Sequence, residues 1–190
     1  MTPRRICSVL VVAFLAVPSV VGAQAIPDLL LAHGTLSFDA KATLGAFTGV
    51  TSTVTGQLTG ASALSSVRGW VEAPSKSLNS KNDHRDRDMA GSLEIDKYPV
   101  IRFDLDSVAV GEMLGDSMAV VLKGHFTLHG QMHTANMPGF VWITPSTARF
   151  RGALPVNVKE YGVGGLSKML GFLKMNEMIT VRVDVMFDPQ

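Results

Sequence analysis

Three stretches of sequence decide the fold: VIRFDLD (residues 100–106), LKGHFTLH (residues 122–129) and MITVRVDVMF (residues 178–187). In the first stretch Phe103 and Leu105 alternate with charged residues, and the other two stretches repeat this alternation. A period of two places successive side chains on opposite faces of a β-strand. Each stretch is therefore predicted to be a strand with one apolar and one polar face.

The same alternation continues through most of the chain and predicts about eight strands. They cover residues 36–42, 50–58, 67–73, 100–110, 118–128, 132–143, 147–158 and 178–187. Residues 79–90 are charged and do not alternate, and they predict a short helix capped by Ser77 or Asn79. We therefore expect an all-β fold, an eight-stranded antiparallel barrel with a short helical insertion after the third strand. The pattern by itself also fits an open sandwich.

The first 23 residues have the features of a cleaved signal peptide. Arg4 and Arg5 precede an apolar run over residues 6–17, and small residues follow at positions 21–23. A signal peptidase recognises this arrangement, whereas the apolar run is short for a membrane span of about 20 residues. We expect residues 24–190 to form one exported domain, periplasmic or secreted.

Removal of this segment changes what chemistry the domain can offer. The only cysteine, Cys7, lies inside it, so the mature domain would have no disulfide, thiolate metal site or thiol nucleophile. Loss of Arg4 and Arg5 shifts the formal net charge from +1 to −1, because 15 basic residues then face 16 acidic ones. A near-neutral domain has no electrostatic basis for binding nucleic acid. No later stretch is long enough for a stable membrane span.

Two histidines share a face of one predicted strand. His125 and His129 have a spacing that a metal pair on a strand could use. Lys123 and Thr127 lie on the same face, and the apolar residues take the other. We expect both histidines to face solvent, and we predict no metal site and no cofactor.

The densest polar cluster is NDHRDRD, residues 82–88. It places His84 among carboxylates, which could support acid–base chemistry or bind a cation. Opposite charges at neighbouring positions are more typical of a solvated helical face. The chain has no Gly-x-Ser-x-Gly nucleophile motif and no P-loop. We therefore predict no catalytic residue.

The apolar faces mix large side chains with small ones, such as Ala40 and Gly124. Small residues leave space inside a barrel, or they interdigitate with large ones in a packed core. The methionine-bearing connection over residues 159–177 favours the first interpretation, because flexible side chains suit an adaptable apolar mouth. The predicted ligand-lining residues are Phe38, Phe103, Leu105, Phe126, Phe150 and Leu154, with Met169, Phe172 and Met175 at the mouth. The candidates for holding a polar head group are Arg85, Arg87 and Lys168.

Five segments in order carry a family resemblance. They are LSFDAKATLGAFTG (residues 36–49), RDRDM (85–89), LEIDKYPVIRF (93–103), LKGHFTLHG (122–130) and YGV (161–163). With these segments the chain resembles the YceI-like family of exported, lipocalin-like barrels associated with polyisoprenoid binding. It departs from the family pattern at Asp88, where many relatives have histidine, and over residues 130–133.

The resemblance implies that the barrel holds a long isoprenoid chain, such as a polyprenyl phosphate or a quinone tail. We therefore expect an exported, non-catalytic lipid-binding protein whose partner is an isoprenoid or another long-chain lipid. The chain is also compatible with a homodimer. Two alternatives stay open: a lipid-modifying enzyme of the barrel class that uses the polar cluster around His84, and a stress-related module whose core is packed shut.

Overall fold

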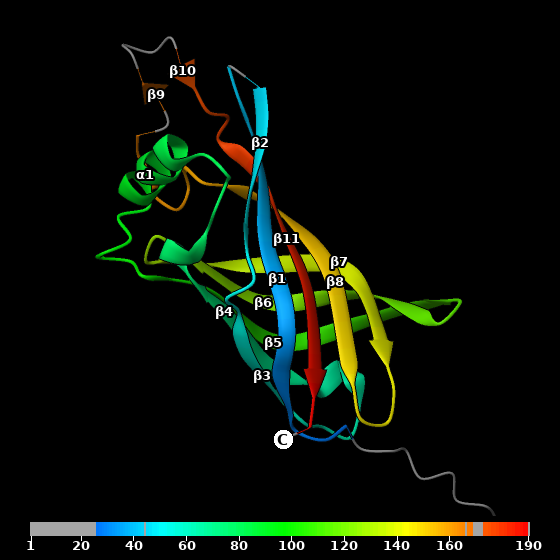
Figure 1. Ribbon diagram of the computed structural model, residues 1–190. Coiled ribbons are helices and arrows are strands. Elements are labelled where there is room, and N and C mark those ends of the chain that lie inside the picture. The colour runs from blue at the N-terminus through cyan, green and yellow to red at the C-terminus, as the bar shows by residue number, and fades with distance from the viewer. Residues whose placement is uncertain (1–25, 44, 166, 169–172, 190) are drawn as a thin grey trace, which may run out of the picture.

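Figure 1 shows a computed structural model of the protein, which describes residues 26–43, 45–165, 167–168 and 173–189. The strands are β1 (Leu29–Ala42), β2 (Gly45–Thr51), β3 (Thr55–Thr59), β4 (Arg68–Pro74), β5 (Val100–Leu114), β6 (Ser117–Leu128), β7 (Gln131–Ile143), β8 (Ala148–Asn157), β9 (Ser167–Lys168), β10 (Leu173–Lys174) and β11 (Met178–Asp188). The helices are α1 (Asp83–Ser92) and two 3-10 helices, η1 (Leu64–Ser66) and η2 (Ser75–Ser77). The predicted signal peptide, residues 1–23, lies outside the described residues.

The long strands form one antiparallel sheet that closes into a barrel (Figure 1). Neighbours follow the order β11-β8-β7-β6-β5-β4-β3-β1, and β11 also pairs with β1, which closes the ring. β1 pairs with β3 at Leu29 and Leu30, and with β2 over residues 36–42, so β2 and β3 share one position beside it. The barrel has eight strand positions, which confirms the predicted fold class.

The strand predicted over residues 50–58 is divided into β2 and β3. The backbone N–H of Thr53 donates to the Thr51 hydroxyl at 3.0 Å, and that hydroxyl also lies 2.7 Å from the Ser77 hydroxyl. Such local side-chain bonds compete with the sheet ladder and end the strand. Because of this break, α1 follows β4, the strand that the sequence analysis counts as the third.

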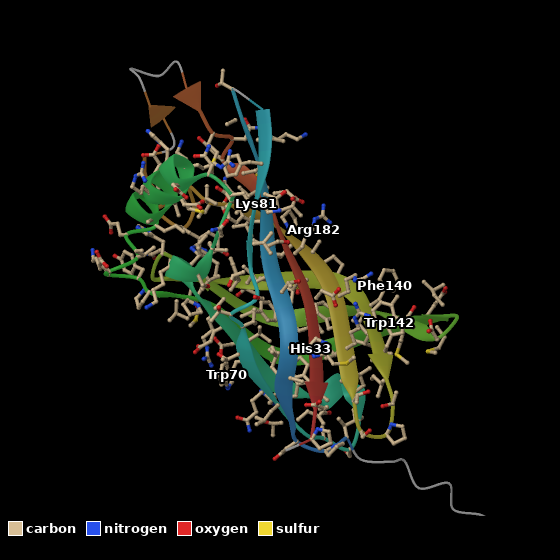
Figure 2. All side chains as sticks on the ribbon, viewed as in Figure 1. His33, Trp70, Lys81, Phe140, Trp142 and Arg182 are labelled. Atoms are coloured by element: carbon tan, nitrogen blue, oxygen red, sulfur yellow. The ribbon has the colours of Figure 1, made fainter. Side chains whose placement is uncertain are left out.

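The predicted alternation holds along β11, where Val181, Val183 and Val185 are buried and Arg182 is exposed on the outer face (Figure 2). The largest fully buried side chains are Phe126 on β6 and Met137 on β7. Each such side chain contributes roughly 1.5–3 kcal/mol by leaving water. The core therefore lies inside the barrel, as the apolar phase of the strands predicts.

The turn between β6 and β7 consists of His129 and Gly130, both with positive φ (51° and 70°). Two such residues form the turn type that suits the twist of a tight hairpin, and Leu128 pairs directly with Gln131 across it. The alternation of β6 ends at Leu128, so the prediction that His129 faces solvent with His125 is wrong. The His129 side chain is only 12% exposed.

Helix α1 covers the barrel end away from the C-terminal end of β11 (Figure 1). Its cap is Asn82, whose side chain accepts from the backbone N–H of Arg85. The predicted caps are wrong because the Asn79 side chain accepts from the N–H of Lys81, and the Ser77 hydroxyl donates to the Pro74 carbonyl. Within the described part of the chain, no helix is long and apolar enough to cross a membrane.

Candidate ligand-binding cavity

A cavity of about 680 Å³ lies at the barrel end under α1. Apolar side chains from the strands, from α1 and from the connecting segments make up most of its wall. They are Leu36, Phe38, Ala42, Phe47, Leu78, Met89, Leu93, Ile101, Phe126, Leu128, Val158, Val163, Met175, Ile179 and Val181. Its volume lies inside the range of roughly 300–1,000 Å³ that is typical of small-molecule sites. We call it the mouth cavity.

The other half of the barrel is nearly filled. A second internal cavity there has a volume of only about 80 Å³. Leu36, Ile101, Phe126 and Val181 line both cavities, so this layer of side chains divides the barrel interior. A ligand that entered at the mouth would meet this layer as a floor. Neither the fully open nor the fully packed interior considered from the sequence describes this barrel.

The predicted lining residues divide between the two halves. Phe38, Phe126 and Met175 line the mouth cavity. Phe103, Leu105 and Phe150 line the small cavity, together with Phe126. Leu154 is buried but lines neither cavity. Met169 and Phe172 lie outside the described residues.

The head-group candidates lie in three different places. Arg85 is at the wall of the mouth cavity, with its guanidinium 4.5 Å from the centre of the Phe47 ring. Its Nε and Nη2 atoms donate to the hydroxyl and carbonyl of Ser80, each at 2.8 Å, which holds the group in place. Arg87 lines a separate cavity, and Lys168 belongs to β9, where side chains are outside the description.

That separate cavity, of about 340 Å³, adjoins the mouth cavity and is more polar. The two share Asp88, Ser92 and Gly165 as lining residues. Arg87 and His129 also line the polar cavity, beside the glycine-rich segment 162–165. An apolar surface and a polar surface therefore lie next to each other, as an elongated ligand with an apolar chain and a polar end requires.

His129 ties together three segments at this end of the barrel. Its Nδ1 atom lies 3.1 Å from the Tyr161 carbonyl oxygen, and its Nε2 atom lies 3.4 Å from a carboxylate oxygen of Glu94. Its ring packs edge-on against Tyr98 with 4.4 Å between centroids. Tyr161 itself is buried under Phe126, and burial raises the pKa of its phenol. The Nδ1 contact and the ring packing fix the imidazole beside the site, while Nε2 is buried without a hydrogen-bond partner among the described residues.

Several wall residues that were not predicted from the sequence lie outside the strands. Leu78, Met89, Leu93 and Val163 all line the mouth cavity. Met89 and Leu93 are four residues apart, which places them on one side of a helical turn. This spacing was the available signal, but the charged residues around it obscured an apolar face.

Polar side chains of α1 do not form a recognisable catalytic arrangement. His84 lies 3.4 Å from Asp88, and their side chains are 80% and 40% exposed. His125 instead pairs with Asp106 at 3.0 Å on the outer surface. Across the described residues, no three histidine, cysteine or acidic side chains come together as a metal site would require.

Comparison with known proteins identifies the family. The YceI-like domain matches residues 28–188, which is nearly all of the barrel. The chain belongs to the YceI-like domain family. This membership agrees with the predicted lipocalin-like barrel and with the order of the five sequence segments. No curated protein matches the chain.

Solved structures show the same fold at low sequence identity. A polyisoprenoid-binding domain from Saccharophagus degradans, implicated in plant cell wall breakdown, has a TM-score of 0.69 and 16% identity and covers 87% of this YceI-like chain and 99% of its own. BcnA from Burkholderia cenocepacia has a TM-score of 0.64 and 15% identity over 80% of this chain and 95% of its own. A YceI protein from Campylobacter jejuni has a TM-score of 0.52 and 12% identity over 65% and 72%.

Proposed function

We propose that this YceI-like protein is an exported, non-catalytic carrier that holds an isoprenoid or quinone-type chain in the mouth cavity. The observation that carries the proposal is the open cavity of about 680 Å³ with a mainly apolar wall at one end of an otherwise filled barrel. The polyisoprenoid-binding domain among its structural neighbours supports the ligand class. The signal-like first 23 residues support a periplasmic or secreted location.

The wall chemistry favours a chain-like lipid over a polar metabolite. Burial of each methylene contributes about 0.8 kcal/mol, so a long chain gains affinity along its whole length without a strong polar anchor. The dividing layer at Phe126 would set the depth to which the chain enters.

The polar end of the ligand would lie at α1. Arg85 is held at the cavity wall by Ser80, and Arg87 lines the adjoining polar cavity. A guanidinium group recognises phosphate through paired N–H donors. We therefore include a phosphate or another anionic head among the ligands that fit this protein best.

The proposal is tested by closing the cavity. Ala42 lines the mouth cavity, so Ala42→Trp places a bulky ring at its wall and narrows it. Ala46, on the neighbouring strand β2, is exposed, and Ala46→Trp is the matched control. Native mass spectrometry of protein purified from its own compartment should show a co-purifying lipid in the wild type and in the control but not in Ala42→Trp. A ligand-free wild type that also takes up no polyprenyl alcohol or isoprenoid quinone would contradict the proposal.

The head-group assignment has its own measurement. Binding of a polyprenyl phosphate should exceed binding of the corresponding alcohol in the wild type, and Arg85→Gln should reduce this preference several-fold while leaving alcohol binding unchanged. Turnover of a lipid that is lost in His84→Ala would instead favour the enzyme. Because His84 is mostly exposed, this substitution tests catalysis without disturbing the core.

A further inference from the structure

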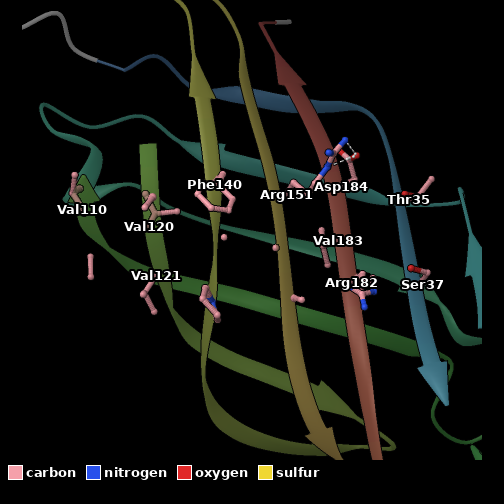
Figure 3. Close-up of a pocket in the computed structure, with 17 residues that line it drawn as sticks. Thr35, Ser37, Val110, Val120, Val121, Phe140, Arg151, Arg182, Val183 and Asp184 are labelled. Carbon is pink, nitrogen blue, oxygen red and sulfur yellow. Dashed lines mark hydrogen bonds and ion pairs between the residues drawn. The ribbon is translucent and has the colours of Figure 1, made fainter. Parts of the chain in front are cut away.

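A groove of about 800 Å³ lies on the outer face of the barrel (Figure 3). It crosses strands β5, β6, β7, β8, β11 and β1, and it shares no lining residue with the mouth cavity. Its floor is formed by apolar side chains from four neighbouring strands: Ala109, Ala119, Val121, Pro138, Phe140 and Ala153. Outer faces of antiparallel sheets are usually polar, so this groove is shaped and lined like a surface for apolar contact.

The hairpin of β5 and β6 projects from the barrel beside this groove (Figure 1). Val110, Met113 and Leu114 on this hairpin are 49%, 59% and 53% exposed. Phe140 and Trp142 of β7 lie beside this hairpin (Figure 2), with 6.5 Å between their ring centroids. Apolar side chains that gather on an exposed finger, next to an apolar groove, mark an interaction surface.

The hairpin is acidic. Between residues 109 and 121 the only charged residues are Glu112 and Asp116. Asp116 accepts a hydrogen bond from the Trp142 indole at 3.3 Å. Glu112 is exposed and forms no ion pair with any residue that the structure describes.

The side of the groove away from the hairpin is basic. Arg149, Arg151 and Arg182 supply three guanidinium groups there, against the carboxylates of Asp184 and Asp39. Arg151, Arg182 and Asp184 line the groove itself, and the two arginine side chains are more than half exposed. Three arginines against two carboxylates leave this side of the groove with an excess of one positive charge, which is opposite in sign to the hairpin.

We propose that two copies of this chain associate through a two-fold contact, in which the β5–β6 hairpin of each copy lies in the outer groove of the other. A two-fold interface uses the same patch on both copies, so one chain must carry both complementary halves. This chain does so, since Val110 both begins the exposed hairpin tip and lines the groove. In the contact Glu112 approaches the exposed arginines of the second copy.

This association leaves the ligand site accessible. Figure 1 places the hairpin and α1 on opposite sides of the barrel, so a second copy at the groove does not cover the mouth cavity. The dimer therefore does not depend on the proposed ligand. Each copy would carry its own open cavity, facing away from the interface.

Sedimentation velocity of the purified protein over a concentration series tests the proposal. We expect a dimer, with a dissociation constant in or below the range of about 1–100 μM for a modest interface. Leu114→Asp in the hairpin and Phe140→Asp in the groove should each raise this constant about tenfold or more. Glu112→Arg should raise it severalfold, most strongly at low salt.

The matched control is Met132→Asp. Met132 is 60% exposed, lies on β7 as Phe140 does, and is absent from the groove. This substitution should leave the dissociation constant unchanged, and thermal melting should show that all variants are folded. The proposal is overturned by a monomer at about 0.2 mM, by a dimer that Leu114→Asp and Phe140→Asp do not weaken, or by a groove that binds lipid vesicles without self-association.

Discussion

Replacement of Phe126 by alanine would test the packing of the barrel and the division of its interior together. Phe126 is 2% exposed and lines both the mouth cavity and the small cavity. Its ring also packs edge-on against Tyr161, with 5.7 Å between centroids. Removing the ring takes away one of the largest buried side chains and opens a passage through the dividing layer.

The expected loss of stability follows from this burial. Truncation of a buried phenylalanine costs about 3–5 kcal/mol of unfolding free energy, because the neighbouring side chains relax only partly into the space. The lost contact with Tyr161 accounts for about 0.5–1.5 kcal/mol of such a cost. For a domain of this size each kcal/mol lowers Tm by about 2–4 °C, so we expect a decrease of about 10 °C.

Urea denaturation with linear extrapolation measures the change in unfolding free energy. The control is Phe140→Ala, since Phe140 is 40% exposed and the chemical change is the same. At low protein concentration the control should cost less than about 1 kcal/mol. If Phe126→Ala costs no more than the control, the argument that Phe126 closes a packed layer is refuted. In binding assays, the Phe126→Ala variant should accept a longer isoprenoid chain than the wild type does.

Two further predictions concern local geometry and acid stability. Gly124→Ala should destabilise the protein by about 1–3 kcal/mol, because the new Cβ would clash with the Asp104 carbonyl oxygen. Gly91→Ala in α1 meets open space and should stabilise the protein by up to about 1 kcal/mol. Equal effects of the two substitutions in urea denaturation would contradict the close approach of β5 to Gly124. Hydrogen bonding to Arg149 lowers the pKa of the Asp184 carboxyl below 3.8, so its contribution is present above the unfolded pKa and is lost as pH falls below about 4. Asp184→Asn should therefore flatten the fall in stability between about pH 4 and 2, and an unchanged slope of the urea midpoint against pH would disprove this.

Much of the fold is predictable because strand alternation is a local property. The phase of residues 178–187 alone tells which side chains of β11 face the core, and the structure confirms it. The helix cap was not predictable in the same way. Ser77, Asn79 and Asn82 are all suitable cap residues, and only the hydrogen bonds that the folded chain gives to the first two leave Asn82 for α1.

For the candidate site, the sequence predicted which side chains face the barrel interior but not how far along the barrel axis each one lies. Phe38 and Phe103 both lie on inward faces, yet one lines the mouth cavity and the other the small cavity. The difference depends on the height of each residue along the barrel axis, which the strand register sets. His129 shows the same limit, because a turn with positive φ turned its side chain away from the polar face of β6.

The sequence alone determined the eight strand positions of the barrel, the inner and outer faces of the long strands, and the family, because these depend on residue order along the chain. Only the tertiary structure decided where space remains: a cavity of about 680 Å³ under α1, a filled half below Phe126, and a groove outside the barrel. Free volume arises from side chains that meet across the barrel from distant parts of the chain. A local sequence pattern does not predict these long-range contacts, and the two proposed binding surfaces depend on them.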